Sequence, residues 1–220
     1  LDLYALFRSE GMDFMPYKGP ALSAFIYKDT AMREFSDLDF LIKPKFFSQA
    51  KNLLLAQGFQ PEEKVPVRID SQYLDSQNEC GFIHVGKGVR VDVHWNISPR
   101  HFGICVDPEW LWSGLSQVAM NEAMMPALPV EKLILVLAIH GAHHGWGRMQ
   151  WICDLGNLLR SSADIQWEEI EESSLRFGAN RTLALGLTLA HELLAAPCPE
   201  HYYEDGLIHK LAREAVLILS

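Results

Sequence analysis

Cysteine is scarce in this sequence and never appears in a paired motif. The four cysteines of the 220-residue chain, Cys80, Cys105, Cys153 and Cys198, are widely separated. We therefore predict neither a zinc ribbon nor a disulfide framework, and we expect a reducing, cytoplasmic location. No signal peptide is recognisable, and no apolar run reaches the roughly 18 residues of a membrane helix. These absences predict a soluble protein without a membrane partner.

Basic charge is also in short supply. Lysine and arginine together number 19 against 28 acidic residues, which gives a net charge of −9. Proteins that neutralise nucleic-acid phosphates carry a basic patch, so a nucleic-acid partner is disfavoured. The hydrophobic content of 49% indicates a globular chain with a real core. Because the chain begins without Met inside an apparent helix and ends in an apolar pattern, we expect helical turns to be missing at both ends.

The first half of the chain alternates between helical and strand patterns. We predict helices at 2–10, 21–29 and 45–57 and strands at 13–18 and 37–42. Three further segments alternate between apolar and polar residues and are predicted to add antiparallel strands, with a hairpin turn at 86–88. These segments are 65–70, 80–85 and 88–97.

The second half of the chain is predicted to be helical. Residues 107–118 form a short helix or loop, and residues 120–129 form a connector. The spacing of apolar residues predicts five helices, at 130–145, 147–160, 167–177, 179–195 and 205–219. We therefore expect an α+β fold, in which an α/β domain (residues 1–105) precedes an all-helical domain (106–220).

Two aspartates lie within the predicted strand DLDFLI, although Asp is poorly suited to strands. Asp37 and Asp39 share one face of this strand, and a neighbouring strand VDVHW would bring Asp92 beside them. Three carboxylates on one face repel one another unless a cation lies among them. Oxygen ligands suit Mg²⁺ or Mn²⁺, and a pair of such ions supports phosphoryl or nucleotidyl transfer. The alternative is an ordinary strand with one solvated face.

Four segments in this order resemble a known family: YKGPAL, SDLDFLI, VDVHW and HGAHHGWGRMQWICDLGNLL. They are similar to a bacterial family of uncharacterised nucleotidyltransferases within the polymerase-β-type superfamily. The resemblance implies a polymerase-β-like nucleotidyltransferase core, a mixed sheet with flanking helices, followed by a helical domain. It also implies that Asp37 and Asp39 bind both metal ions, that Asp92 binds the catalytic ion, and that a nucleoside triphosphate (NTP) is the substrate.

The glycine turn departs from the superfamily pattern. The resemblance implies that Gly19 lets the nucleotide's phosphates approach the backbone. The next residue is Pro20, which offers neither the hydroxyl of a Gly-Ser motif nor a backbone N–H. Lys18 and Arg33 are candidates to contact the triphosphate instead, and the alternative for both is plain surface charge.

Histidines form a second group of candidates. His94 follows Asp92 by two positions, so it would lie close enough to tune the metal site or contact a phosphate; the alternative is a buried structural histidine. His140 and His144 share one helix face, as zinc ligands do in HExxH enzymes, but the Glu is missing. Hydrogen bonding between domains is their alternative role, whereas the family resemblance favours one histidine in the nucleotide cleft.

We therefore expect a metal-dependent enzyme that moves a nucleoside monophosphate from an NTP to an unidentified acceptor. A small molecule, a sugar, an antibiotic-like hydroxyl and a protein side chain are all open as acceptors. Asp92 would also help to deprotonate the acceptor hydroxyl. One alternative is a degenerate nucleotide-binding or interaction module, marked by Pro20. Another is a metal phosphohydrolase centred on the helical histidines.

Overall fold

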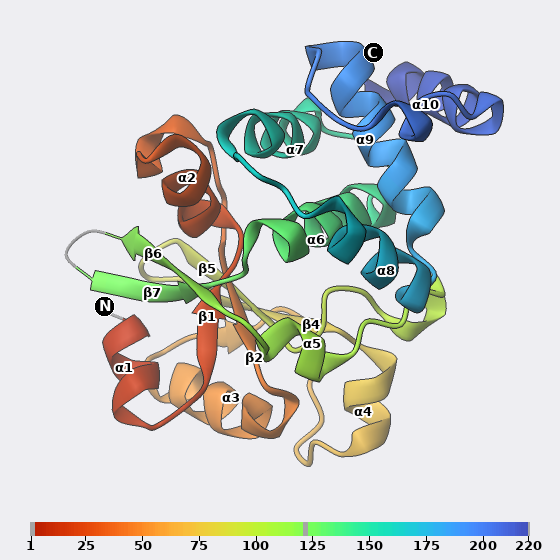
Figure 1. Cartoon of the computed structure of the whole chain (residues 1–220). Helices are drawn as coiled ribbons and strands as arrows, with labels where there is room; N and C mark the ends of the chain where they lie inside the picture. The colour runs from red at the N-terminus through yellow and green to blue at the C-terminus, as the bar shows by residue number, and fades with distance from the viewer. Residues whose placement is uncertain (1–2, 121–122, 220) are drawn as a thin grey trace. The chain divides into compact units, whose positions relative to one another are not determined.

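A computed structural model describes residues 3–120 and 123–219, which form two compact units (Figure 1). The first unit comprises the described residues up to His101 together with Pro108–Leu128. The second comprises Phe102–Asp107 and the described residues from Pro129 onward. That residues 1–105 and 106–220 are separate domains stays a prediction.

The first unit is built on a five-stranded mixed sheet with the strand order β1-β2-β5-β4-β3. Only β2 and β5 are parallel, and the other neighbours are antiparallel. Pro16 lies in β1, an edge strand, where a missing backbone N–H is tolerated. The strands are β1 (Phe14–Pro16), β2 (Leu38–Ile42), β3 (Gln60–Pro61), β4 (Glu79–His84) and β5 (Val89–His94).

One face of the two central strands belongs to the hydrophobic core. Phe40 of β2 and Val93 of β5 are register partners and are fully buried. They share this core with residues of two helices, α1 (Leu3–Ser9) and α3 (Phe47–Ala56). Because side chains alternate along a strand, residues 39, 92 and 94 all point to the opposite face. The period of two thus separates the core from the polar group described below.

Besides short 3-10 turns, the remaining described elements of the first unit are three α-helices and a hairpin. Figure 1 shows α2 on the opposite side of the sheet from α1 and α3. These elements are α2 (Gly19–Tyr27), α4 (Ser71–Ser76), α5 (Pro108–Trp112), β6 (Ser116–Met120) and β7 (Ala123–Ala127).

The predicted strand at 65–70 is wrong, because this segment contains neither helix nor strand. Val65 packs on the core from a loop, which produces the apolar alternation without strand pairing. Lys51 holds the loop by donating hydrogen bonds to the carbonyls of Pro66 and Val67, at 3.1 and 3.3 Å. Pro66 itself has no N–H to donate to a ladder.

The hairpin of β6 and β7 lies where the sequence predicted a loop and a connector. Pro126 argues against a strand, because proline is depleted in strands and cannot donate to the ladder. The pairing partner overrides this preference, since Pro126 faces Gln117 and Met125 faces Val118 in the ladder. In contrast, the predicted hairpin with its turn at 86–88 is confirmed as β4 and β5.

The second unit is helical, and its described residues contain no strand. The five predicted helices are confirmed as α6 (Val130–His143), α7 (Met149–Ser161), α8 (Trp167–Phe177), α9 (Asn180–Leu194) and α10 (Gly206–Leu219). Trp146 is 1% exposed and packs against two helical glycines. A Cβ on Gly141 would overlap its ring, and one on Gly186 would lie 2.8 Å from it. No helix among those described is long and apolar enough to cross a lipid bilayer.

Candidate active site

Asp39 and Asp92 face each other across the parallel pair β2 and β5. They are register partners, and both side chains lie on the sheet face opposite the core. Asp39 is 5% exposed and Asp92 is 9% exposed. Ligand atoms of Asp39, Asp92 and His94 all lie within 4.8 Å of one another, as metal ligands do. The structure therefore brings together two of the three predicted carboxylates and the predicted histidine.

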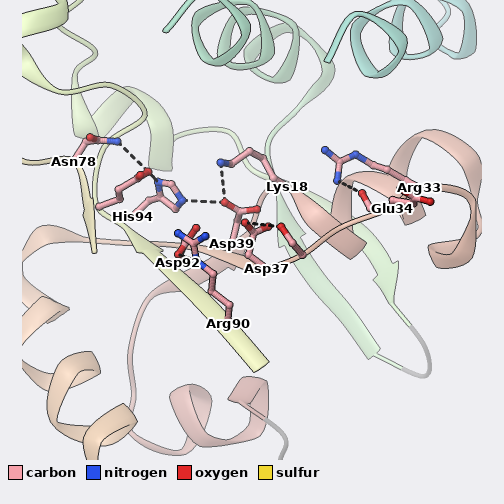
Figure 2. Close-up of polar contacts among 11 residues, drawn as sticks. Lys18, Arg33, Glu34, Asp37, Asp39, Asn78, Arg90, Asp92 and His94 are labelled. Atoms are coloured by element: carbon pink, nitrogen blue, oxygen red, sulfur yellow. Dashed lines mark hydrogen bonds and ion pairs between the residues drawn. The ribbon is translucent and has the colours of Figure 1, made fainter. Parts of the chain in front are cut away.

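One oxygen of Asp39 has two nitrogen partners (Figure 2). Asp39 Oδ1 lies 2.7 Å from Lys18 Nζ and 3.0 Å from His94 Nε2. Its other oxygen, Oδ2, lies 3.8 Å from the position that a Cβ on Gly19 would take. Burial alone would raise the pKa of Asp39, but Lys18 and His94 together hold this pKa well below its usual range.

His94 lies between two carboxylates. Its Nε2 faces Asp39, and its Nδ1 lies 2.8 Å from Glu79 Oε2, which also accepts a hydrogen bond from Asn78. Burial and Lys18 lower the pKa of His94, yet the hydrogen bonds with Asp39 and Glu79 outweigh them and raise it. Burial alone would raise the pKa of Glu79, but the hydrogen bond and the charge of His94 lower this pKa to about 2. The geometry therefore favours an imidazolium that orients Asp39.

Asp92 is less well satisfied. Its buried Oδ1 makes no hydrogen bond with any described residue. The nearby cation, Arg90 Nε, lies 3.3 Å from this oxygen but 2.9 Å from Glu62 Oε2. Burial raises the pKa of Asp92 to about 6, with a further increase from Asp39 and Asp37 and a partial decrease from Arg90 and His94. A buried carboxylate oxygen without a donor, beside a second carboxylate, fits Mg²⁺ or Mn²⁺.

Asp37 lies immediately before β2 and is only half-buried. Ser36 Oγ lies 3.3 Å from its Oδ2. Its backbone carbonyl oxygen lies 3.2 Å from the Cβ position of Gly19, so the turn before α2 and the start of β2 are in close contact. Among the described residues, the compact group of possible metal ligands contains His94 and does not contain Asp37. The predicted role of Asp37 as a metal ligand therefore stays a prediction.

The glycine turn leads directly into α2. Gly19 has φ of +52°, a left-handed conformation that strains other residues. Pro20 occupies the first turn of the helix, where the missing N–H has no partner to lose. Lys18, only 8% exposed, precedes the helix and points to Asp39. Figure 2 shows Arg33 beside Glu34, whose carbonyl accepts its hydrogen bond, and away from Asp39.

The helical histidines form an aromatic cluster within the second unit. The rings of His140 and His144 lie 4.7 Å apart, and His144 lies 5.1 Å from Trp151. The ring of His143 lies 5.1 Å from that of Phe102. No group of possible metal ligands among the described residues includes these histidines. The structure thus offers no support for a phosphohydrolase centre, and a nucleotide contact at His140 or His144 stays a prediction.

The comparisons with known proteins concern the family and the fold of the chain. Residues 1–195 match the sequence family described as uncharacterised nucleotidyltransferase. The chain belongs to this family. No curated protein matches its sequence. A similar solved structure is that of the lincosamide antibiotic adenylyltransferase LnuA with lincomycin bound, at 16% identity and a TM-score of 0.50. The match covers 73% of this chain and 94% of LnuA, and it confirms the predicted α+β nucleotidyltransferase fold.

Three residues of the candidate site were missed in the sequence. Arg90 lies two positions before Asp92, so the alternation that identified His94 would also have placed Arg90 on this face. Glu79 lies opposite His94 in the β4–β5 ladder, which the predicted hairpin could have indicated. Glu62 follows β3 and is brought in by a backbone hydrogen bond to Gly81, for which the sequence carries no signal.

Proposed function

We propose that this chain is a divalent-metal-dependent nucleotidyltransferase that moves a nucleoside monophosphate from an NTP to a hydroxyl group of an acceptor. The proposal depends above all on the register pair of Asp39 and Asp92, buried on one sheet face, in which one Asp92 oxygen accepts no hydrogen bond from a described residue. Membership of the nucleotidyltransferase family supports the same reaction class. A catalytic centre is also where carboxylates with strongly shifted pKa values gather.

The carboxylates of Asp37, Asp39 and Asp92 would hold Mg²⁺ or Mn²⁺. When bound, the metal would supply positive charge to the triphosphate and lower the pKa of the acceptor hydroxyl. Asp92 would accept the proton from this hydroxyl, because burial makes its carboxylate more basic than an exposed one. His94 and Glu79 would keep Asp39 oriented toward the reacting phosphate.

Lys18 and Gly19 would shape the nucleotide side of the site. The Lys18 ammonium has three N–H donors, and one is used by Asp39. The others would be available to phosphate oxygens, which the missing side chain of Gly19 would allow to approach the turn. Arg33, His140 and His144 remain proposed nucleotide contacts on the strength of the family resemblance alone.

A small molecule that carries a hydroxyl is the first acceptor class to test, because LnuA is by its title an adenylyltransferase of an antibiotic. Sugars and protein side chains follow, and the net charge of −9 disfavours nucleic acid. Pro20 fits the first helical turn without disturbing it, but it still offers a phosphate no N–H, so the degenerate module stays the alternative proposal.

Calorimetric titration of ATP, CTP, GTP and UTP tests the proposal, with Mg²⁺ or Mn²⁺ and then with a chelator. We expect metal-dependent binding of at least one NTP, which Asp92→Asn should abolish. Asp75→Asn is the control, because Asp75 forms an exposed ion pair with Arg100 in the same unit. Unchanged, metal-dependent NTP binding in folded Asp92→Asn would refute the assigned site, and binding that a chelator does not affect would refute the metal dependence.

A further inference from the structure

The partners of Asp39 leave only one of its oxygens open. A carboxylate oxygen has two lone pairs. Lys18 Nζ at 2.7 Å and His94 Nε2 at 3.0 Å both take Oδ1, so this oxygen is saturated. As the predicted ligand of both ions in a two-metal site, Asp39 would contribute one oxygen to each ion. Here Oδ2 alone can serve a divalent ion.

Lys18 is held in this position by its surroundings. Its side chain is 10% exposed, and Nζ lies 5.0 Å from the ring centroid of Tyr17. Tyr17 is itself 5% exposed, and its ring packs edge-on against His94 at 5.1 Å. To leave Asp39, the ammonium would have to give up a buried ion pair without a described carboxylate to replace it at this distance. Lys18 is therefore a fixed part of the site.

The charges near the sheet lead to the same conclusion. His94 bridges Glu79 and Asp39, and Arg90 bridges Glu62 and Asp92. Together these two cations balance no more than the charges of Glu79 and Glu62. The predicted ligands Asp37, Asp39 and Asp92 then bring three negative charges. One ammonium and one divalent ion neutralise them together.

We propose that the Lys18 ammonium takes the place of one of the two metal ions, so that this nucleotidyltransferase binds a single divalent ion, through Asp39 Oδ2 and Asp92. This inference rests on the proposed function. Lys18 bridges Asp39 and a phosphate oxygen of the NTP with two of its N–H donors, as a second metal ion would. Lys18 would thereby bind the triphosphate in place of the hydroxyl or backbone N–H that Pro20 does not offer.

The number of bound Mn²⁺ ions tests the proposal directly. Electron paramagnetic resonance measures free Mn²⁺ during a titration of the protein, without nucleotide and without any need for activity. We expect one ion per chain for the unsubstituted protein and for Lys18→Arg, which keeps the charge. Lys18→Met should bind two, because it opens a lone pair of Asp39 Oδ1. Lys43→Met is the matched control, since Lys43 forms a more exposed pair with Asp13 at 2.9 Å and should leave the count at one.

The outcomes separate this inference from the function on which it rests. Two ions on the unsubstituted protein would overturn the inference and leave metal-dependent nucleotidyl transfer intact. A folded Lys18→Met variant that still binds one ion would also overturn it. No bound ion on any of the proteins would overturn the proposed metal dependence as well. If Lys18→Met does not fold, as circular dichroism would show, the count on the unsubstituted protein still decides between one ion and two.

Discussion

In the metal-free protein, Asp39→Asn should lower the free energy of unfolding, whereas Asp92→Asn should raise it. Asp39→Asn removes the negative partner of Lys18, which is 8% exposed, and of His94, which is 2% exposed. Two buried cations then lose their shared counter-charge. Breaking a buried pair in this way costs about 3 to 5 kcal/mol. Because His94 keeps its second partner Glu79, we expect a loss near the lower end, about 3 kcal/mol.

Asp92→Asn should instead stabilise the metal-free protein. Folding raises the pKa of Asp92 from 3.8 to about 6, which means that its charge disfavours folding by up to about 3 kcal/mol at neutral pH. Arg90 keeps its partner Glu62 after the substitution, so about 1 to 2 kcal/mol should be gained. The cost of the charge is absent below pH 3.8 and complete above about pH 6. The gain should therefore be smaller at pH 5 than at pH 7.5.

Urea unfolding followed by circular dichroism in the presence of a chelator measures both effects. Asp75→Asn, at the exposed ion pair with Arg100, should stay within about 0.5 kcal/mol of the unsubstituted protein. Stabilisation by Asp39→Asn would show that Lys18 and His94 are not the partners that keep Asp39 ionised. Destabilisation by Asp92→Asn would show that the charge of Asp92 does not oppose folding. A gain for Asp92→Asn that is as large at pH 5 as at pH 7.5 would contradict the raised pKa.

Three further predictions concern separate features. Gly141→Ala should lower the free energy of unfolding by about 1 to 3 kcal/mol in urea titrations, because the added Cβ overlaps the ring of Trp146; a gain in stability would contradict this packing. Gly19→Ala should cost about 1 to 2 kcal/mol at its φ of +52° and weaken calorimetric NTP binding, and unchanged affinity would argue against phosphates at this turn. The exposed Cys105 should react with a thiol reagent at pH 8 far faster than Cys198. Burial raises the pKa of Cys198 to about 11, so about one in a thousand of these thiols is ionised at pH 8. Equal reaction rates of Cys105 and Cys198, measured by peptide mass spectrometry, would refute the raised pKa.

Local patterns were sufficient for the elements that carry the site. The alternation in DLDFLI and VDVHW predicted β2 and β5, and the same period of two placed Asp92 and His94 on one face. Apolar spacing predicted all five helices of the second unit. The same rule was wrong at residues 65–70, where Val65 is apolar because a loop packs on the core. Periodicity reports which side chains are buried and does not report whether the backbone is paired.

The sequence by itself determined which residues could share a face, because side-chain direction along a strand depends only on the local backbone. Only the tertiary structure decided that β2 lies beside β5 with Asp39 opposite Asp92, and that Lys18 is buried against Asp39. These arrangements join segments as far apart as Asp39 and His94, which are separated by 55 positions. Register between such segments is set by the packing of the whole sheet, since many local patterns are compatible with several registers.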